Sequence, residues 1–534
     1  MTVGKHNEPP FENPSARLSG FTPVSRRRFI RDAAASAAAF PLLVRAQRES
    51  DDGQRLFRHG VASGDPLSDR VILWTRVTPP SSRSATSPMA VRWQIATDER
   101  MTDVVGRGTV DAALERDFTV KVDAGSLRPG RTYYYAFDAG GEQSPIGRTR
   151  TLPTDGNRLR LATVSCSNYP AGYFNVYRCV ANRDDLDAVV HVGDYIYEFG
   201  DGAYGNASDI GRAPLPRTAS VTLDEYRQRY AVYRSDIDLQ AAHQRHPFIA
   251  VWDDHESANN AWSGGAGGHT DANGPWAVRR EAAYRAYMEW MPIREASSGG
   301  IHLYRGFRIG TLADLIMLDT RTFRDKQALS TDTATLARPD RSMLGAGQEA
   351  WLFDQLRTSQ RGTTTWRILG QQVLFAPLTP PGAPVLEVDA WEGYPAARAR
   401  LLDFIGTERI ANVVVLTGDI HSSWASDVPR DQLLGYQAST GAGSLAVEFV
   451  TPAISSPPLF SIAGVRERAP LLRLFAPQVK YLDGERRGYA LVDITPERVI
   501  TEWYHVPTVT ERTPMETRSA RFVCERGSAR LVAG

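Results

Sequence analysis

The run Ala188-Val189-Val190-His191-Val192 leads directly into Gly193-Asp194-Tyr195-Ile196-Tyr197-Glu198. Its first five residues are mostly apolar, which is typical of a short buried strand. A Gly-Asp pair after such a run indicates a turn. The two tyrosines and the glutamate in the same turn suggest that it does more than reverse the chain. A buried strand that ends in polar residues indicates the fold class and also marks a candidate functional site.

The same combination recurs three times in the chain. The polar ends are Ser165-Cys166-Ser167-Asn168 after the strand 159–164, Asp253-Asp254-His255-Glu256 with Asn259-Asn260 after 248–252, and Thr417-Gly418-Asp419-Ile420-His421 after 413–416. Helical patterns, such as 174–182 and 223–233, lie between these strands. Strands that alternate with helices predict an α/β layered domain, in which ligands collect at the carboxyl ends of the strands.

The donor groups at these strand ends suit hard metal cations. Carboxylate, phenolate and amide oxygens are hard donors. A tyrosine binds well only to a strongly acidic ion, because its proton must leave from a pKa near 10. We therefore expect a ferric ion with a second hard divalent ion nearby. A carboxylate such as Asp194 can bridge two metals about 3.5–4 Å apart, an arrangement that suits hydrolysis of phosphate esters.

Residues 56–153 have a different sequence pattern from the rest of the chain. They contain several short strands at close spacing, separated by turns, which predict a β-sandwich. The stretch Leu127-Arg128-Pro129-Gly130 followed by Thr132-Tyr133-Tyr134-Tyr135 is similar to the last hairpin of a fibronectin type III-like domain. We expect a small N-terminal β-sandwich before the α/β domain.

Residues 1–46 form an expected export signal. Ser25-Arg26-Arg27-Arg28-Phe29 precedes an uncharged run, 33–44, and Ala46 is a plausible cleavage point. The adjacent arginines identify a twin-arginine signal. The expected partner is therefore the twin-arginine translocation machinery, and the expected location is periplasmic or secreted.

Composition excludes several other classes of protein. Lys plus Arg is 62 and Asp plus Glu is 61, for a net charge of +1, which gives no support to a nucleic-acid-binding surface. Three cysteines exclude a disulfide scaffold and a multi-cysteine zinc module. After the signal, no stretch is long and apolar enough to be an integral membrane segment.

The order of the strand ends resembles that of the calcineurin-like metallophosphoesterases, and more narrowly that of the PhoD-like alkaline phosphatases and phosphodiesterases. The stretches that carry the resemblance are 60–66, 192–198, 251–260, 370–373, 417–424 and Arg487-Gly488-Tyr489. The resemblance implies a layered metallophosphoesterase sandwich of mixed sheets flanked by helices, over residues 157–510. Residues 511–534 are expected to form a C-terminal tail.

The resemblance also implies the metals and their ligands. Ferric iron is expected to be held by Cys166, Asp194, Tyr197 and His421. Calcium is expected to be held by Asp194, Asn259 and Asp419, with Asn260 as the alternative to Asn259. The identity of the second ion rests on the resemblance, since manganese or magnesium would also accept these oxygen donors.

Other polar residues near these stretches have alternative interpretations. His255 either polarises the leaving group or packs behind the site. Arg321, which follows the strand end at Asp319, can clamp a phosphate bidentately or serve a structural role. His191, Cys179 and Cys524 are expected to be structural, with Cys524 in the charged tail.

The leading hypothesis is an exported metal-dependent phosphoesterase, an alkaline phosphatase or phosphodiesterase in which metal-activated water attacks a phosphate mono- or diester. One alternative is a phospholipase D-like enzyme acting on phospholipid head groups. Another is a non-catalytic exported binding protein.

Overall fold

Two large β-sheets lie at the centre of the computed structural model, which describes residues 55–80, 87–205, 210–295, 302–379, 383–462 and 464–534. The expected signal, 1–46, lies outside the described residues. The larger sheet has ten strands in the order β22 (Val532–Ala533), β21 (Thr517–Glu525), β20 (Arg498–His505), β19 (Gly488–Ile494), β9 (Leu159–Val164), β10 (Ala188–His191), β11 (Pro247–Ala250), β1 (Val61–Gly64), β2 (Val71–Arg76) and β5 (Thr119–Ala124). 

The second large sheet has seven strands, in the order β12 (Arg305–Ile309), β13 (Ala313–Met317), β14 (Trp366–Gly370), β15 (Val413–Thr417), β17 (Ser444–Val450), β16 (Ser423–Pro429) and β18 (Val479–Asp483). A smaller sheet contains β4 (Val104–Ala112), β3 (Met89–Ala96), β6 (Thr132–Ala139) and β7 (Glu142–Gln143), with β8 (Gly147–Arg150) paired to β6. 

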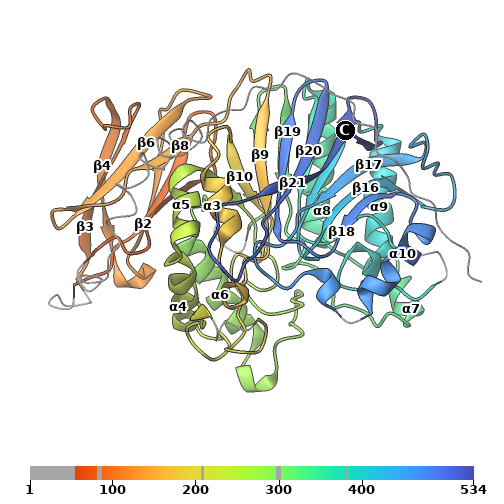
Figure 1. The fold of residues 1–534 in the computed structure, drawn as a ribbon, viewed down its shortest axis with the longest axis horizontal. Coiled ribbons are helices and arrows are strands. Elements are labelled where there is room, and N and C mark those ends of the chain that lie inside the picture. The colour runs from red at the N-terminus through yellow and green to blue at the C-terminus, as the bar shows by residue number, and fades with distance from the viewer. Residues whose placement is uncertain (1–54, 81–86, 206–209, 296–301, 380–382, 463) are drawn as a thin grey trace, which may run out of the picture. The chain divides into compact units, whose positions relative to one another are not determined.

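Helices cover the outer faces of the two large sheets (Figure 1). The helices α3 (Asn175–Ala181), α4 (Leu223–Arg234), α5 (Ile237–Arg245) and α6 (Trp276–Trp290) pack on the ten-stranded sheet, and α8 (Gly345–Arg361) and α9 (Pro395–Thr407) pack on the seven-stranded sheet. The short α7 (Thr333–Leu336) and α10 (Val465–Phe475) lie in connections. The layers are thus helix, sheet, sheet, helix.

Both faces of these sheets can be buried because their central strands are apolar along most of their length. In β13, Leu315 and Met317 join the core between the two sheets, whereas Ile316 and the following Leu318 join the core under α8 and α9. Successive side chains of a strand point to opposite faces. A continuous apolar run therefore serves a strand that is covered on both sides.

Parallel pairing brings the expected polar ends together. In the ten-stranded sheet β9, β10 and β11 are parallel, and in the seven-stranded sheet β13, β14 and β15 are parallel. A bridge between Ser165 and Ala453 links the end of β9 to the residues after β17. The carboxyl ends of both parallel groups therefore open onto one edge of the fold.

The N-terminal strands form a sandwich that shares a sheet with the α/β layers. Apolar residues of β1, β2 and β5 pack against those of β3, β4 and β6 in a separate core. At the same time β1 pairs with β11 in parallel, with Gly64 opposite Phe248. The ten-stranded sheet therefore continues across the boundary near residue 153 that the sequence predicts.

At the C-terminus the structure differs from the expected tail over 511–534. Residues 517–525 form β21, which pairs with β20 along its length. Phe522 and Cys524 point to one face of β21 and are buried in the main core, whereas Arg521 points to the other face. Because the arginines on the other face of β21 give the segment a high charge, its period-two pattern is easily mistaken for a charged tail.

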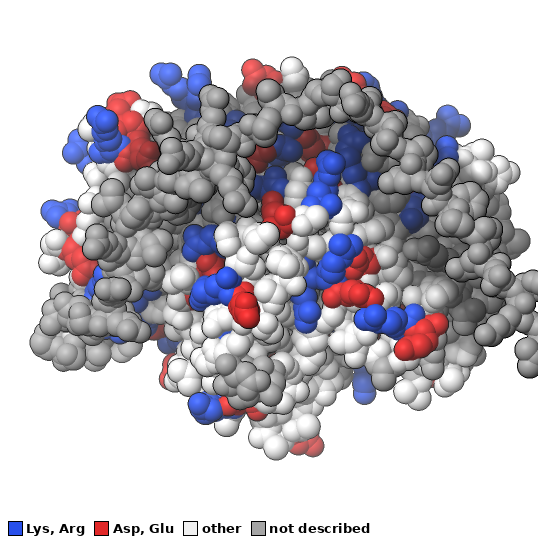
Figure 2. Space-filling model, viewed as in Figure 1, with Lys and Arg blue, Asp and Glu red and all other residues white. Residues whose placement is uncertain are grey.

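The described surface shows mixed charge. On the face in Figure 2 basic and acidic side chains are interspersed among the described residues. Within the described ranges, no helix combines the length and the apolar character needed to cross a membrane.

Gly64 is expected to be required where β1 joins the ten-stranded sheet. A Cβ atom there would lie 2.2 Å from the carbonyl oxygen of Pro292 and 2.6 Å from that of Phe248. Since backbone cannot move away as a side chain can, Gly64→Ala should lower the free energy of unfolding by about 1–3 kcal/mol. Thermal unfolding of both proteins measures this loss.

The matched control is Gly347→Ala in α8, where a Cβ would meet open space. It should leave stability unchanged or raise it by up to about 1 kcal/mol, because alanine is the better helix former. Equal melting temperatures for wild type and Gly64→Ala would contradict the tight junction.

Candidate metal centre

Four of the six predicted metal ligands have left-handed backbone conformations. The φ angles are 62° for Cys166, 57° for Asp194, 62° for Asp419 and 51° for His421. A residue with a Cβ in this conformation costs roughly 1–2 kcal/mol. Such strain persists only where surrounding structure enforces it, and it concentrates at functional sites. Each of these side chains is thereby turned sharply away from the end of its strand.

Hydrogen bonds between the strand ends hold these turns in place. The N–H of Cys166 donates to the carbonyl oxygen of Gly193 at 3.2 Å, and that of Ser167 donates to Asp194 at 2.8 Å. Gly193 has a φ of 109°, and a Cβ on it would lie 2.3 Å from Cβ of Asp253. Only glycine allows the ends of β10 and β11 to approach this closely.

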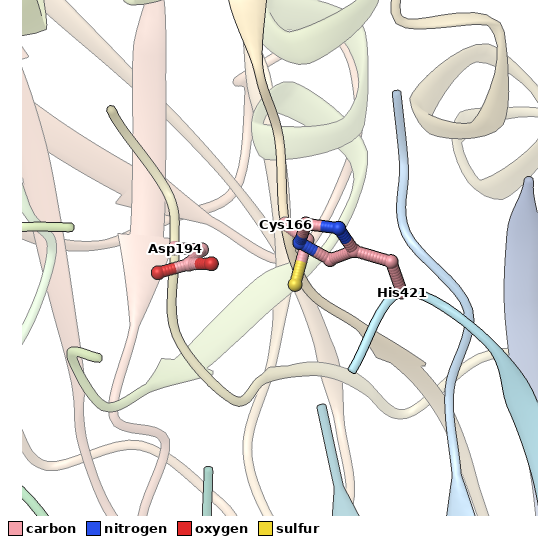
Figure 3. A group of neighbouring side chains, drawn as sticks. All are labelled: Cys166, Asp194 and His421. Carbon is pink, nitrogen blue, oxygen red and sulfur yellow. The ribbon is translucent and has the colours of Figure 1, made fainter. Parts of the chain in front are cut away.

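Cys166, Asp194 and His421 offer ligand atoms that all lie within 4.8 Å of one another. Figure 3 shows these three side chains, which project from three separate segments of the chain. Tyr197 completes the group, because its hydroxyl donates to Oδ2 of Asp194 at 2.8 Å and lies 3.1 Å from Nε2 of His421. The structure thus brings all four predicted iron ligands together. 

The contacts of Nδ1 determine the orientation and the tautomer of the His421 imidazole. Nδ1 lies 2.9 Å from the carbonyl oxygen of Pro457 and 3.2 Å from the hydroxyl of Tyr204. A proton on Nδ1, donated to Pro457, leaves a lone pair on Nε2 toward Tyr197. Burial lowers the pKa of His421 to about 4, which favours this neutral form.

The thiol and the phenol of the group resist ionisation in the absence of a cation. Burial raises the pKa of Cys166 well above its usual value, and the charge of Asp194 adds to the rise. Burial and the Asp194 carboxylate likewise raise the pKa of Tyr197. A cation at this point would reverse both effects, since it stabilises the thiolate and the phenolate.

A second group of carboxylates lies beside the first. Oxygen atoms of Asp253, Asp254 and Asp419 lie within 4.8 Å of one another, and Asp194 forms a further group with Asp254 and His255. Burial raises the pKa of Asp419 to about 7, although Arg321 opposes the shift. Asp194 therefore belongs to both sides of the site, as a bridging ligand must.

Arg321 is enclosed by this acidic group. Its buried guanidinium bonds to Asp253 and Asp389, donates to Asp419 at 2.8 Å and lies 3.5 Å from Asp254. These carboxylates outweigh burial and hold the pKa of Arg321 well above its usual value. Arg324 adds a second cation at Asp389.

His255 lies at the edge of both groups. Its Nδ1 is 2.8 Å from Oε2 of Glu198, and its ring stacks on Tyr197 with centroids 4.3 Å apart. Burial opposes protonation, but Asp254, Glu198 and Asp194 together raise the pKa of His255 well above its usual value. Glu198 also accepts the backbone N–H of Asn259 at 2.7 Å.

The position of Asn259 differs from that of Asn260. Asn259 is partly buried, whereas Asn260 is exposed. Through the shared carboxylate of Glu198, Asn259 is linked to His255. The structure places the expected structural residues elsewhere: His191 is buried beside Tyr177, and Cys179 lies on α3.

The residues present fit cations. Three buried carboxylate oxygens have no hydrogen-bond partner among the described residues: Oδ1 of Asp194, Oδ2 of Asp253 and Oδ1 of Asp254. A buried carboxylate oxygen without a partner is costly, and cations bound at the two groups would offset this cost. 

The sequence pattern alone predicts no role for Asp253, Asp254, Asp389 or Glu198. The two aspartates stand in a strand end that the pattern had marked, and two acidic residues in succession after a buried strand were an available signal. Asp389 has no such signal, because it lies in a connection far along the chain between β14 and α9.

Comparison with known proteins gives the family. A model of the PhoD-like phosphatases matches residues 161–503, and a model of the N-terminal domain of PhoD-like phosphatases matches 43–153. Alkaline phosphatase D of Bacillus subtilis (strain 168) is 37% identical over 493 residues, which cover 89% of this chain and 82% of that protein. The chain belongs to the PhoD-like phosphatase family.

A solved structure of PhoD agrees with this assignment. It matches with a TM-score of 0.81 and 35% identity, covering 91% of this chain and 93% of that chain. The predicted family, the layered sandwich with an N-terminal β domain, and the enzyme class, a PhoD-type phosphatase, are confirmed.

Glu256 is expected to maintain the centre of this phosphatase without holding a metal. Its buried carboxylate accepts the backbone N–H groups of Asp194 at 3.0 Å, Tyr195 at 2.6 Å and Asp253 at 2.8 Å. In Glu256→Gln an amide NH₂ replaces one acceptor and faces a backbone donor. We expect a loss of about 2–3 kcal/mol of stability together with weaker metal binding.

Thermal unfolding and elemental analysis check both effects. Glu225→Gln is the control, because Glu225 caps α4 at the surface and its change should cost about 1 kcal/mol or less. Full stability and full metal content in Glu256→Gln would show that Glu256 is not needed to hold the backbone of Asp194, Tyr195 and Asp253.

Proposed function

We propose that this chain is an exported, metal-dependent phosphoesterase that hydrolyses phosphate mono- or diesters by direct attack of water, with ferric iron and calcium as its metal ions. The observation that carries the proposal is the meeting of two donor groups at Asp194, one containing Cys166 and His421 and the other Asp254 and His255. One buried carboxylate can therefore serve two cations.

Cys166, Asp194, Tyr197 and His421 would hold the iron. A thiol and a phenol that both resist ionisation call for a strongly acidic ion, which favours ferric iron over a divalent ion. The hydrogen bond from Nδ1 of His421 to Pro457 supports the orientation of the ring.

Asp194, Asn259 and Asp419 would hold the calcium, and the geometry adds Asp254 to this group. Oxygen donors alone suit calcium, and they suit manganese or magnesium as well. In this proposal Arg321 serves as a fixed counter-charge that keeps four aspartates together in the acidic group.

When bound, the two cations supply Lewis-acid polarisation of the phosphate and lower the pKa of a water molecule. The protein contributes position and protons. Asp254, Glu198 and Asp194 raise the pKa of His255, and Glu198 holds its Nδ1. Its other nitrogen can therefore give a proton to the leaving oxygen of the ester.

Asp194→Asn should remove most of the activity. An amide cannot serve two cations, so we expect kcat/KM for a chromogenic phosphodiester to fall about a hundredfold or more, together with loss of iron by elemental analysis. Asp184→Asn, an exposed carboxylate paired with Arg245, is the control and should match wild type. Undiminished hydrolysis by Asp194→Asn would overturn the metal mechanism, and absence of iron from wild type would overturn the Cys166–Tyr197 site.

Export is proposed to depend on the arginine pair of the signal. Replacing Arg26 and Arg27 by lysine should leave the precursor in the cytoplasm, because the twin-arginine pathway reads that pair. Cell fractionation with activity assays measures the distribution. Replacing Arg31 by lysine, outside the pair, is the control. Equal export of the double variant and wild type would contradict this route.

A further inference from the structure

Arg487 lies next to the metal centre and has no role in the mechanism described above. It belongs to the stretch Arg487-Gly488-Tyr489, at the start of β19. Its Nε donates to the carbonyl oxygen of Ser456 at 3.2 Å. The hydroxyl of Ser456 in turn lies 2.8 Å from that of Tyr197 and 3.0 Å from the carbonyl oxygen of Cys166. One residue thus separates the guanidinium from two of the proposed iron ligands.

The guanidinium also acts on His421 through its charge. Tyr204, whose hydroxyl is 3.2 Å from Nδ1 of His421, opposes the lowering of the Arg487 pKa by burial. Arg487 is in turn among the charges that, after burial and His255, act on the pKa of His421. These effects agree with the hydrogen bond to Ser456, whose hydroxyl lies beside Tyr197.

Arg487 has no carboxylate partner among the described residues. Its one side-chain hydrogen bond there goes to a neutral carbonyl group. The adjacent Arg486, by contrast, donates to Asp483 at 2.7 Å, and Arg321 is enclosed by four carboxylates. A half-buried guanidinium whose terminal N–H groups face no carboxylate is able to bind an anion from solution.

We propose that Arg487 binds a non-bridging phosphate oxygen of the substrate at the rim of the metal centre. The proposal rests on the proposed function. Arg487 adds a positive charge on the Ser456 side of Cys166 and Tyr197, which favours the approach of an anion there. Charge-assisted bonds from its terminal nitrogens would orient the phosphorus for attack by water.

Inorganic phosphate is the probe for this site. Calorimetric titration of the metal-loaded full chain measures its affinity without turnover. Arg487→Gln should weaken phosphate binding about tenfold or more, because one charge-assisted contact is lost, and should lower kcat/KM for a phosphodiester by a similar factor. Arg487→Lys should be intermediate, since it keeps the charge but not the planar pair of donors.

Arg486→Gln is the matched control, because it removes a charge from the neighbouring residue and should leave phosphate affinity unchanged. Metal content should equal that of wild type in all three variants. Wild-type phosphate affinity in Arg487→Gln would overturn the proposal. Loss of metal in Arg487→Gln would also overturn it, because Arg487 would then act by supporting the Ser456 segment.

Two further results keep the test decisive. If Arg487→Gln does not fold, Arg487→Lys decides: weaker phosphate binding at full metal content supports the proposal, and unchanged binding overturns it. Failure of the proposed function would appear separately, as wild-type hydrolysis that persists after metal removal, whereas phosphate binding is compared between variants without any reaction.

Discussion

Excess buried negative charge is the constraint on which the rest of this phosphatase depends. Asp194, Asp253, Asp254, Asp389 and Asp419 lie in or beside one acidic edge, and Arg321 and Arg324 are the arginines paired with them there. Burial of carboxylates without compensating charge is expensive. Among the described residues, three of their oxygens have no hydrogen-bond partner, and this supports the cations proposed for the site.

The arrangement of the strands in the two large sheets brings these carboxylates together. Parallel strands from both sheets end at the same edge, and a bridge at Ser165 fastens one sheet to the other. The left-handed turns at Cys166, Asp194 and His421 then rotate the ligands toward a common point. The strain of these turns is offset by hydrogen bonds between the strand ends and by the deep apolar core behind them.

Much of this site follows from the sequence, because a buried strand and its polar end are local features. The pattern at 188–198 predicts a strand and a turn, and the structure has both. The pairing of β1 with β11 and the enclosure of Arg321 by Asp389 join residues far apart in the chain, and nothing in either local sequence marks the other. The same holds for β21. Its arginines give the segment a polar composition, and its buried face is recognised only once β21 is paired with β20.

The position of β19 has a consequence for the order of events in the cell. This strand covers the edge of β9, which leads directly to Cys166, yet the two strands are far apart in the sequence. During synthesis one edge of β9 therefore stays unpaired until β19, which is far downstream in the sequence, has been made. The scaffold of the proposed metal centre is therefore completed only once β19 has been synthesised and has paired with β9.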